Sequence, residues 1–134
     1  MGRVLGIDWG ERRVGVALSD TRGVFARPFS TLSNDQDLIQ KIKQICLSEN
    51  IEKIVVGLPV RTDGKVGRLE KLVRKFAERL EREIGIEVIL WDERFSSAAA
   101  SYYMSSIREI DSRKIKDKVE ASIILQGYLE SVRS

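Results

Sequence analysis

Short apolar runs separated by turn-forming residues dominate the first third of the chain. "RVLGID" (residues 3–8) and "RRVGVALSD" (residues 12–20) flank the short polar stretch "WGER". Two such runs around a tight turn predict a β-hairpin. "GVFARPFSTL" (residues 23–32) predicts a third strand. Pro28 places this strand at a sheet edge, because proline lacks the N–H that a central strand must donate.

Two later segments each contain a continuous apolar run rather than an alternating pattern. They are "IEKIVVGLP" (residues 51–59) and "IEVILW" (residues 86–91). Continuous apolar strands are typical of parallel strands whose two faces are both covered. The polar, glycine-containing stretch "RTDGKVG" (residues 61–67) predicts a loop after the first of them.

Apolar residues recur at helical spacing in the segments 33–50 and 68–84. Ser33 and Gln36 fit a capping box at the start of the first segment. Gly85 can end the second helix in a left-handed conformation. The buried stripes predicted for the two helices are Leu38, Ile39, Ile42, Ile45 and Cys46, and Leu69, Leu72, Val73, Phe76 and Leu80.

The pattern near the C-terminus predicts two further helices. Ser96 or Ser97 can cap a short helix over residues 97–104, and residues 105–116 show little periodicity, which predicts a loop. A last helix is expected to begin at Asp117. Its predicted inward face is Ala121, Ile124, Leu125, Tyr128, Leu129 and Val132.

The order of these elements predicts one α/β domain over residues 1–134. Three antiparallel strands come first, and helix crossovers to parallel strands follow, which gives a mixed five-stranded sheet flanked by helices. In such sheets, ligands gather near the carboxyl ends of the parallel strands. Residues that end these strands are therefore the first candidates for function.

Composition narrows the chemistry. The chain contains no histidine, which excludes a histidine general base and a Ser-His or Cys-His nucleophile. Any hydrolysis is then expected to depend on carboxylates with a hard divalent cation. The net charge of +3 is consistent with an anionic partner.

Composition also bears on the compartment. A single cysteine, Cys46, excludes an internal disulfide and favours a reducing compartment, so a cytoplasmic protein is expected. No run is apolar for long enough to cross a membrane, and the first residues do not resemble a secretory signal. No membrane partner is therefore expected.

Three acids occupy positions where a role in solubility does not explain them. Asp8 ends the first strand, Glu93 lies just beyond the last strand, and Asp117 lies on the inward side of the final helix. If the first and last strands are neighbours, the three carboxylates converge. Clustered carboxylates repel one another, and Mg²⁺ or Mn²⁺ relieves this repulsion. Two such ions about 4 Å apart can drive phosphodiester hydrolysis without histidine.

The alternative is structural. Asp8 can cap a turn, and Asp117 can be an acid at a helix start that interacts with the helix dipole. Asp92 is expected to point away from Glu93, because neighbours alternate in an extended chain. Glu120, on the flank of Asp117, is expected to be a solvated surface residue rather than a further ligand.

Four blocks of the sequence resemble the YqgF/RuvX family of Holliday junction resolvases. They are "GIDWGERRVGVALSD", "VVGLPVRTDGKVG", "WDERFSS" and "DKVEASIILQGYL", in the order that the family has them. The resemblance implies an RNase H-like fold, with Asp8, Glu93 and Asp117 as the metal-binding catalytic acids. It implies either a Holliday junction resolvase or a nuclease that matures the 5′ end of pre-16S rRNA. Glu120 stands where the family usually has a small residue.

Basic residues near the expected active edge are candidates for binding nucleic acid. They are Arg12, Arg13, Arg61, Lys65, Arg68 and Arg94. Such residues bind backbone phosphates, although Arg94 can instead pair with an acid. Trp9 and Trp91 can stack on bases, but packing in the core is the simpler expectation.

Two other functions stay open at this point. One is a non-catalytic module that binds nucleic acid or the ribosome. The other is a fragment of an actin-like ATPase, because "GIDWG" resembles the phosphate-binding hairpin of that class. The short chain disfavours the ATPase, which needs two lobes around its nucleotide. A junction resolvase makes two symmetric cuts, so a homodimer is expected if the substrate is branched DNA.

Overall fold

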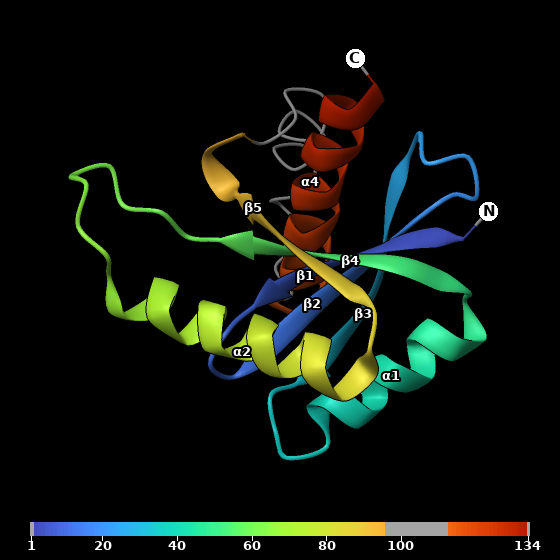
Figure 1. Ribbon diagram of the computed structural model, residues 1–134, viewed down its shortest axis with the longest axis horizontal. Helices are drawn as coiled ribbons and strands as arrows, with labels where there is room; N and C mark the ends of the chain where they lie inside the picture. The colour runs from blue at the N-terminus through green and yellow to red at the C-terminus, as the bar shows by residue number, and fades with distance from the viewer. Residues whose placement is uncertain (1, 96–112, 134) are drawn as a thin grey trace.

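Five strands in the order β3-β2-β1-β4-β5 form one sheet in the computed structural model, which describes residues 2–95 and 113–133 (Figure 1). The strands are β1 (Arg3–Trp9), β2 (Arg13–Ser19), β3 (Ala26–Ser33), β4 (Ile51–Leu58) and β5 (Glu87–Asp92). β2 pairs antiparallel with β1 and β3, whereas β4 pairs parallel with β1 and β5. The predicted mixed sheet is therefore confirmed.

The position of the last strand differs from the expectation. β4 lies between β1 and β5, so the first and last strands are not neighbours. The hairpin strand β2 occupies one side of β1, and the first parallel strand, β4, takes the other. β3 lies at the sheet edge as Pro28 predicted, and the pairing register shifts beside that proline, between Val16 and Ala17 of β2.

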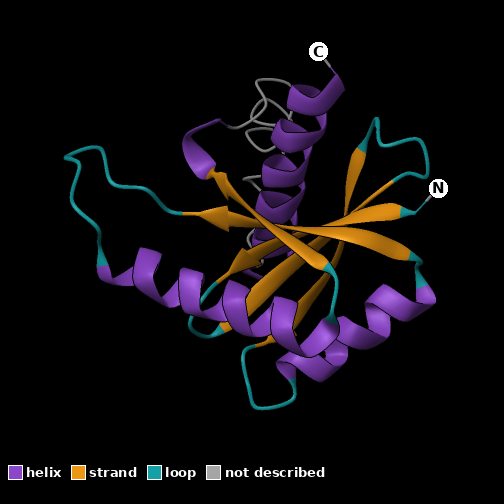
Figure 2. Ribbon diagram, in the orientation of Figure 1, coloured by secondary structure: helices purple, strands orange, loops and turns teal. Residues whose placement is uncertain are grey.

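Helices cover both faces of the sheet. The helices α1 (Leu38–Ser48) and α2 (Arg68–Ile84) pack on one face, and α4 (Arg113–Arg133) crosses the other (Figure 2). Alternation along each strand divides the apolar side chains between these two layers. In β1, Leu5 and Ile7 face α1 and α2, whereas Val4 packs with α4.

Three glycines allow α4 to lie directly on the sheet. A Cβ atom added at Gly15 would come within 2.0 Å of the carbonyl oxygen of Asp117, and one at Gly6 within 2.7 Å of the Leu125 Cβ. A Cβ atom at Gly57 would come within 2.5 Å of Ile124 Cδ1. Larger residues on this face of β1, β2 and β4 would push the helix away.

The ends and the buried faces of α1 and α2 differ from several predictions. Ser33 ends β3, and α1 begins at Leu38 without a side-chain cap, so the capping box is wrong. In α2, Glu70 is buried and Leu69 is exposed, because the buried face lies one position further along. The αL conformation of Gly85, with φ of 81°, confirms the predicted helix end.

The last helix also begins earlier than expected. α4 starts at Arg113, so Asp117 lies one turn inside it, and Val132 is exposed rather than inward. The predicted helix over residues 97–104 lies outside the described residues. Within the described part of the chain, no helix has the length and apolar character needed to cross a membrane.

Candidate active site

Asp8 lies on the α4 side of the sheet because of strand alternation. Its neighbours in β1, Ile7 and Trp9, both face the opposite layer. Asp8 pairs in register with Gly15 of β2, the glycine over which the Asp117 backbone passes. Asp8 thus lies half-buried at the carboxyl end of β1, beneath the first turns of α4.

Glu93 reaches the same region across β4. It begins the short 3₁₀ helix η1 (Glu93–Phe95), which directly follows β5. Gly57 of β4 pairs with Trp91 of β5, and its lack of a side chain leaves room for the Glu93 carboxyl group. A Cβ atom at Gly57 would lie 2.9 Å from Glu93 Oε1. The two acids are therefore brought together without adjacent strands.

This close approach leads to a first prediction. Gly57→Ala is expected to displace Glu93 and Ile124, which costs about 1–3 kcal/mol of folding free energy, as overpacking does. A shift of a positioned group by about 1 Å is expected to slow the nucleic-acid cleavage that the sequence resemblance implies, by roughly 10- to 100-fold. Thermal unfolding and a cleavage assay measure the two effects. An unchanged cleavage rate would contradict the assigned position of Glu93.

Glu120 is part of the cluster, which corrects the expectation of a solvated flank residue. Its carboxyl group is hydrogen-bonded to Asp8. Asp8, Glu93 and Glu120 together line a cavity of about 220 Å³, closed on one side by Ile123 and Ile124. Asp117 and Glu120 are three residues apart on α4, and residues at this spacing lie on one helix face.

Asp117 approaches from the β2 side and forms an ion pair. Arg13 Nε donates to Asp117 Oδ2 at 2.7 Å, and both side chains are largely buried. Side chains alternate between the two faces of a strand. Arg13, Gly15 and Ala17 therefore lie on the same face of β2, beneath α4. Arg13 was predicted to bind nucleic acid, but here its nearest anion is a carboxylate of the site itself.

Burial and like charge make the cluster electrostatically unfavourable. The pKa of Asp8 is raised to about 9, first by burial, then by the hydrogen bond to Glu120 and by the nearby charges of Glu120, Glu93 and Asp117. The pKa of Glu93 is raised by burial and by the charges of Glu120 and Asp92. The positive groups of the protein around the site thus do not balance the negative charge of its carboxylates.

The side chains of this cluster are suitable ligands for a hard divalent cation. All carry carboxylate oxygens, the ligands that Mg²⁺ and Mn²⁺ prefer. Among residues 2–95 and 113–133, no three acidic or cysteine side chains are yet arranged to hold one ion. Asp117 is paired with Arg13, so an ion that takes Asp117 as a ligand has to compete with this ion pair.

The predicted basic residues flank this site on one side. Arg61, Arg68 and Arg94 line a hollow of about 460 Å³ that also contains Glu93. Each has an acidic partner: Asp63 for Arg61, Glu11 for Arg68 and Asp92 for Arg94. Asp92 is thus a partner of Arg94, and the charge of that arginine helps to lower its pKa. Arg12 and Lys65 are exposed nearby in the sequence.

Comparison with known proteins finds relatives that match nearly the whole chain. "Putative pre-16S rRNA nuclease" of Clostridium tetani is 40% identical to the chain over 97% of both lengths. A relative of the same name from Fusobacterium nucleatum is 38% identical over 97% of this chain and 98% of its own length.

Two solved structures share the fold at low sequence identity. RuvC of T. thermophilus, in complex with a Holliday junction substrate, superimposes with a TM-score of 0.64 and 13% identity over 100% of this chain and 97% of its own. Fowlpox virus resolvase, in complex with substrate Holliday junction DNA, gives 0.61 and 12% over 98% and 99%. These matches confirm the RNase H-like fold. The family model for RuvX, described as Holliday junction resolvase, matches residues 2–131. The chain belongs to the RuvX family of Holliday junction resolvases.

Proposed function

We propose that this protein is a divalent-metal-dependent endonuclease that hydrolyses phosphodiester bonds in structured nucleic acid. The observation that carries the proposal is the cavity lined by Asp8, Glu93 and Glu120, with Asp117 one turn away on α4. In a chain without histidine, this is the only group of acids described here that combines burial, convergence and an adjacent set of arginines.

The acids have distinct positions and therefore distinct proposed roles. Mg²⁺ or Mn²⁺, as two ions, would supply activation of a water molecule and stabilisation of the leaving oxygen. Asp8 is central because its carboxyl group is influenced by Glu93, Glu120 and Asp117 together. Glu93 and Asp117 lie on opposite sides of it, on η1 and α4, and we assign both as ligands. Glu120, which lies against Asp8 in the same cavity, is proposed to hold that side chain in position.

The arginines are proposed to hold the substrate backbone. Arg68 contacts Glu11 through two donors, at 2.6 Å and 3.1 Å, and the same planar pair of donors fits a phosphate. Arg94 and Arg61 are exposed and paired with single carboxylates. Exposed ion pairs contribute little stability, so each can exchange its carboxylate for a phosphate at small cost. These three arginines line the hollow beside Glu93, and Arg12 and Lys65 are proposed to extend the basic surface.

Arg13 is expected to compete with the metal for Asp117. In Arg13→Gln, Asp117 is released, so the affinity for Mn²⁺ is expected to rise by about threefold to tenfold, which corresponds to about 1 kcal/mol. Without metal, the variant is expected to be less stable because Asp117 loses its only described cation. Titration calorimetry with Mn²⁺ and thermal unfolding with EDTA measure both. Arg22→Gln, an exposed arginine at the other end of β2, is the control. Weaker Mn²⁺ binding in Arg13→Gln would contradict this role.

The names of the relatives favour precursor rRNA as substrate, whereas the titles of the structural neighbours name Holliday junction DNA. Carboxylate ligands and phosphate contacts serve both. A parallel cleavage assay on a 5′-extended 16S rRNA fragment and on a four-way DNA junction separates them. We expect Mg²⁺-dependent cleavage of the rRNA fragment. Cleavage of the junction by a dimer, with two symmetric cuts, would support the resolvase instead. Binding of either substrate without cleavage, and without sensitivity to EDTA, would support the non-catalytic module.

A further inference from the structure

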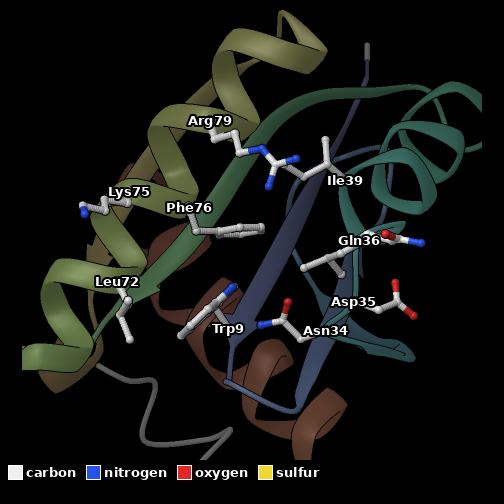
Figure 3. A pocket seen from close by; sticks show the side chains of 10 residues that line it. Trp9, Asn34, Asp35, Gln36, Ile39, Leu72, Lys75, Phe76 and Arg79 are labelled. Carbon is white, nitrogen blue, oxygen red and sulfur yellow. The ribbon is translucent and has the colours of Figure 1, made fainter.

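A second cavity lies on the other face of the sheet, back to back with the acids across β1. Its volume is about 240 Å³, and it opens between α2 and the segment that leads from β3 into α1 (Figure 3). Trp9, the residue after Asp8, forms part of its wall. The nuclease site does not use this cavity.

The cavity has two apolar walls that face each other. Trp9 and Phe76 form one wall, with ring centroids 6.1 Å apart and planes inclined by 38°. Leu38 and Ile39 of α1 form the other. Trp9 is only partly buried, so part of its indole ring is accessible to a ligand. A gap between an aromatic ring and aliphatic side chains accommodates a flat aromatic ring.

Polar groups lie at defined positions around this gap. The Asn34 side-chain nitrogen donates to the carbonyl oxygen of Gly10 at 2.7 Å, which fixes the orientation of the amide. Figure 3 shows the Asn34 oxygen on the side of the cavity, where it can accept a hydrogen bond from a ligand. An amide acceptor beside an aromatic wall matches the exocyclic amino group of a nucleobase.

Cations occupy the rim on the α2 side. Lys75 and Arg79 are one helical turn apart, exposed, and both line the cavity. Figure 3 shows the Arg79 guanidinium extending toward Ile39, whereas the Lys75 ammonium points away from the cavity and has to turn to reach a ligand. Arg79 is paired with Glu83, one turn further along α2. Asp35 lies among the lining residues on the α1 side, where Lys41 partly compensates it at 3.7 Å. The positive rim is therefore one-sided, which suits a ligand with a single anionic end.

We propose that this cavity binds one nucleotide, with its base against Trp9 and its phosphate at Arg79 and Lys75. Stacking on an aromatic side chain is tolerant of base identity, so the site is expected to accept several bases. The nucleotide comes either from a substrate strand that passes over the end of β1 or from the free pool. Only its use by a substrate strand rests on the proposed nuclease function.

Trp9 itself reports binding. In Trp91→Phe, Trp9 is the only tryptophan, and its fluorescence is titrated with AMP, CMP and a single-stranded tetranucleotide. EDTA is present throughout, so nucleic acid is not cleaved and the result does not depend on nuclease activity. We expect saturable quenching by the nucleotides and none by ribose 5-phosphate, which lacks a base.

Charge at the rim gives the matched comparison. In the Trp91→Phe background, Lys75→Glu is expected to weaken binding by about tenfold or more. Lys43→Glu, the same change at an exposed position of α1 outside the cavity, is expected to have no effect. Tighter binding of the tetranucleotide than of AMP identifies a strand as the source, whereas equal binding identifies free nucleotide. Absence of quenching, equal quenching by ribose 5-phosphate, or equal affinity in Lys75→Glu and Lys43→Glu overturns the proposal.

Discussion

Asp8→Asn is expected to reduce cleavage of the substrate by more than about 100-fold, because loss of a metal ligand exceeds the roughly 10- to 100-fold effect of losing an outer-shell partner. Asn keeps the size of the side chain and its capacity for hydrogen bonds. It removes the negative charge that Glu93, Asp117 and Glu120 surround. The loss is therefore expected in the reaction rate at saturating substrate, and not in substrate binding.

The same substitution is expected to stabilise the metal-free protein. Because the pKa of Asp8 is about 9 in the folded state, folding at neutral pH requires this carboxyl group to take up a proton. Taking up this proton costs about 1.4 kcal/mol of folding free energy for each pH unit above the pKa of the unfolded chain. At about pH 7 the cost is up to roughly 4 kcal/mol. Asn needs no proton, so we expect a gain of about 1–3 kcal/mol and a higher Tm.

Matched variants separate this effect from a general one. Asp37→Asn makes the same change at the exposed N-cap position just before α1, where the side chain makes no capping hydrogen bond. Its stability is expected to stay within about 0.5 kcal/mol of the wild type, as for most surface substitutions. If Asp8→Asn kept most of the cleavage activity, or destabilised the protein, Asp8 would not be a charged group of a metal site.

The second large effect is on stability as a function of pH. Both Asp8 and Glu93 have pKa values raised by folding. Each therefore contributes stability that is fully present below the pKa of the unfolded chain and is lost as pH rises through the folded pKa. In EDTA, the free energy of unfolding is expected to fall between about pH 5 and pH 8 by roughly 2–4 kcal/mol.

Measurements on Asp8→Asn, and on the wild type with Mg²⁺, show whether the acids of the site cause this decrease in stability. The arginine-paired acids Glu11, Asp63 and Asp92 have lowered pKa values, so their effects act at lower pH and with the opposite sign. Urea unfolding across this pH range measures the trend. We expect a much smaller decrease in Asp8→Asn, and also in the wild type when Mg²⁺ is present, because the cation takes the place of the proton. A wild-type curve parallel to that of Asp8→Asn would contradict the crowding of acids around Asp8.

The strand positions of Asp8 and Glu93 could be predicted from the sequence, because apolar runs that end on an acid locate the end of a strand. Their convergence was predicted for the wrong reason. β4 separates β1 and β5, and Glu93 reaches toward Asp8 only because Gly57 has no side chain. A glycine within an apolar run signals a close approach, but not what approaches.

Glu120 and Arg13 show a different limit. Glu120 lies three residues after Asp117, a spacing that was available in the sequence, but the start of α4 was placed a turn late. Arg13 alternates with Gly15 on the face under α4, and its pairing with Asp117 joins residues 104 positions apart. Such a pairing depends on how the helix crosses the sheet, which local periodicity does not specify. The cavity at Trp9 likewise forms between α1 and α2, whose relative placement is a tertiary property.

The measurement that tests the central claim most directly is the initial rate of cleavage of a 5′-extended 16S rRNA fragment as a function of Mg²⁺ concentration. The wild type is expected to show no cleavage in EDTA and a rate that rises with Mg²⁺ to a plateau. Asp8→Asn, compared at the same protein concentration, is expected to stay near the EDTA baseline. Cleavage that persists in EDTA, or that is equal in the wild type and Asp8→Asn, would contradict a metal-dependent nuclease site at these acids.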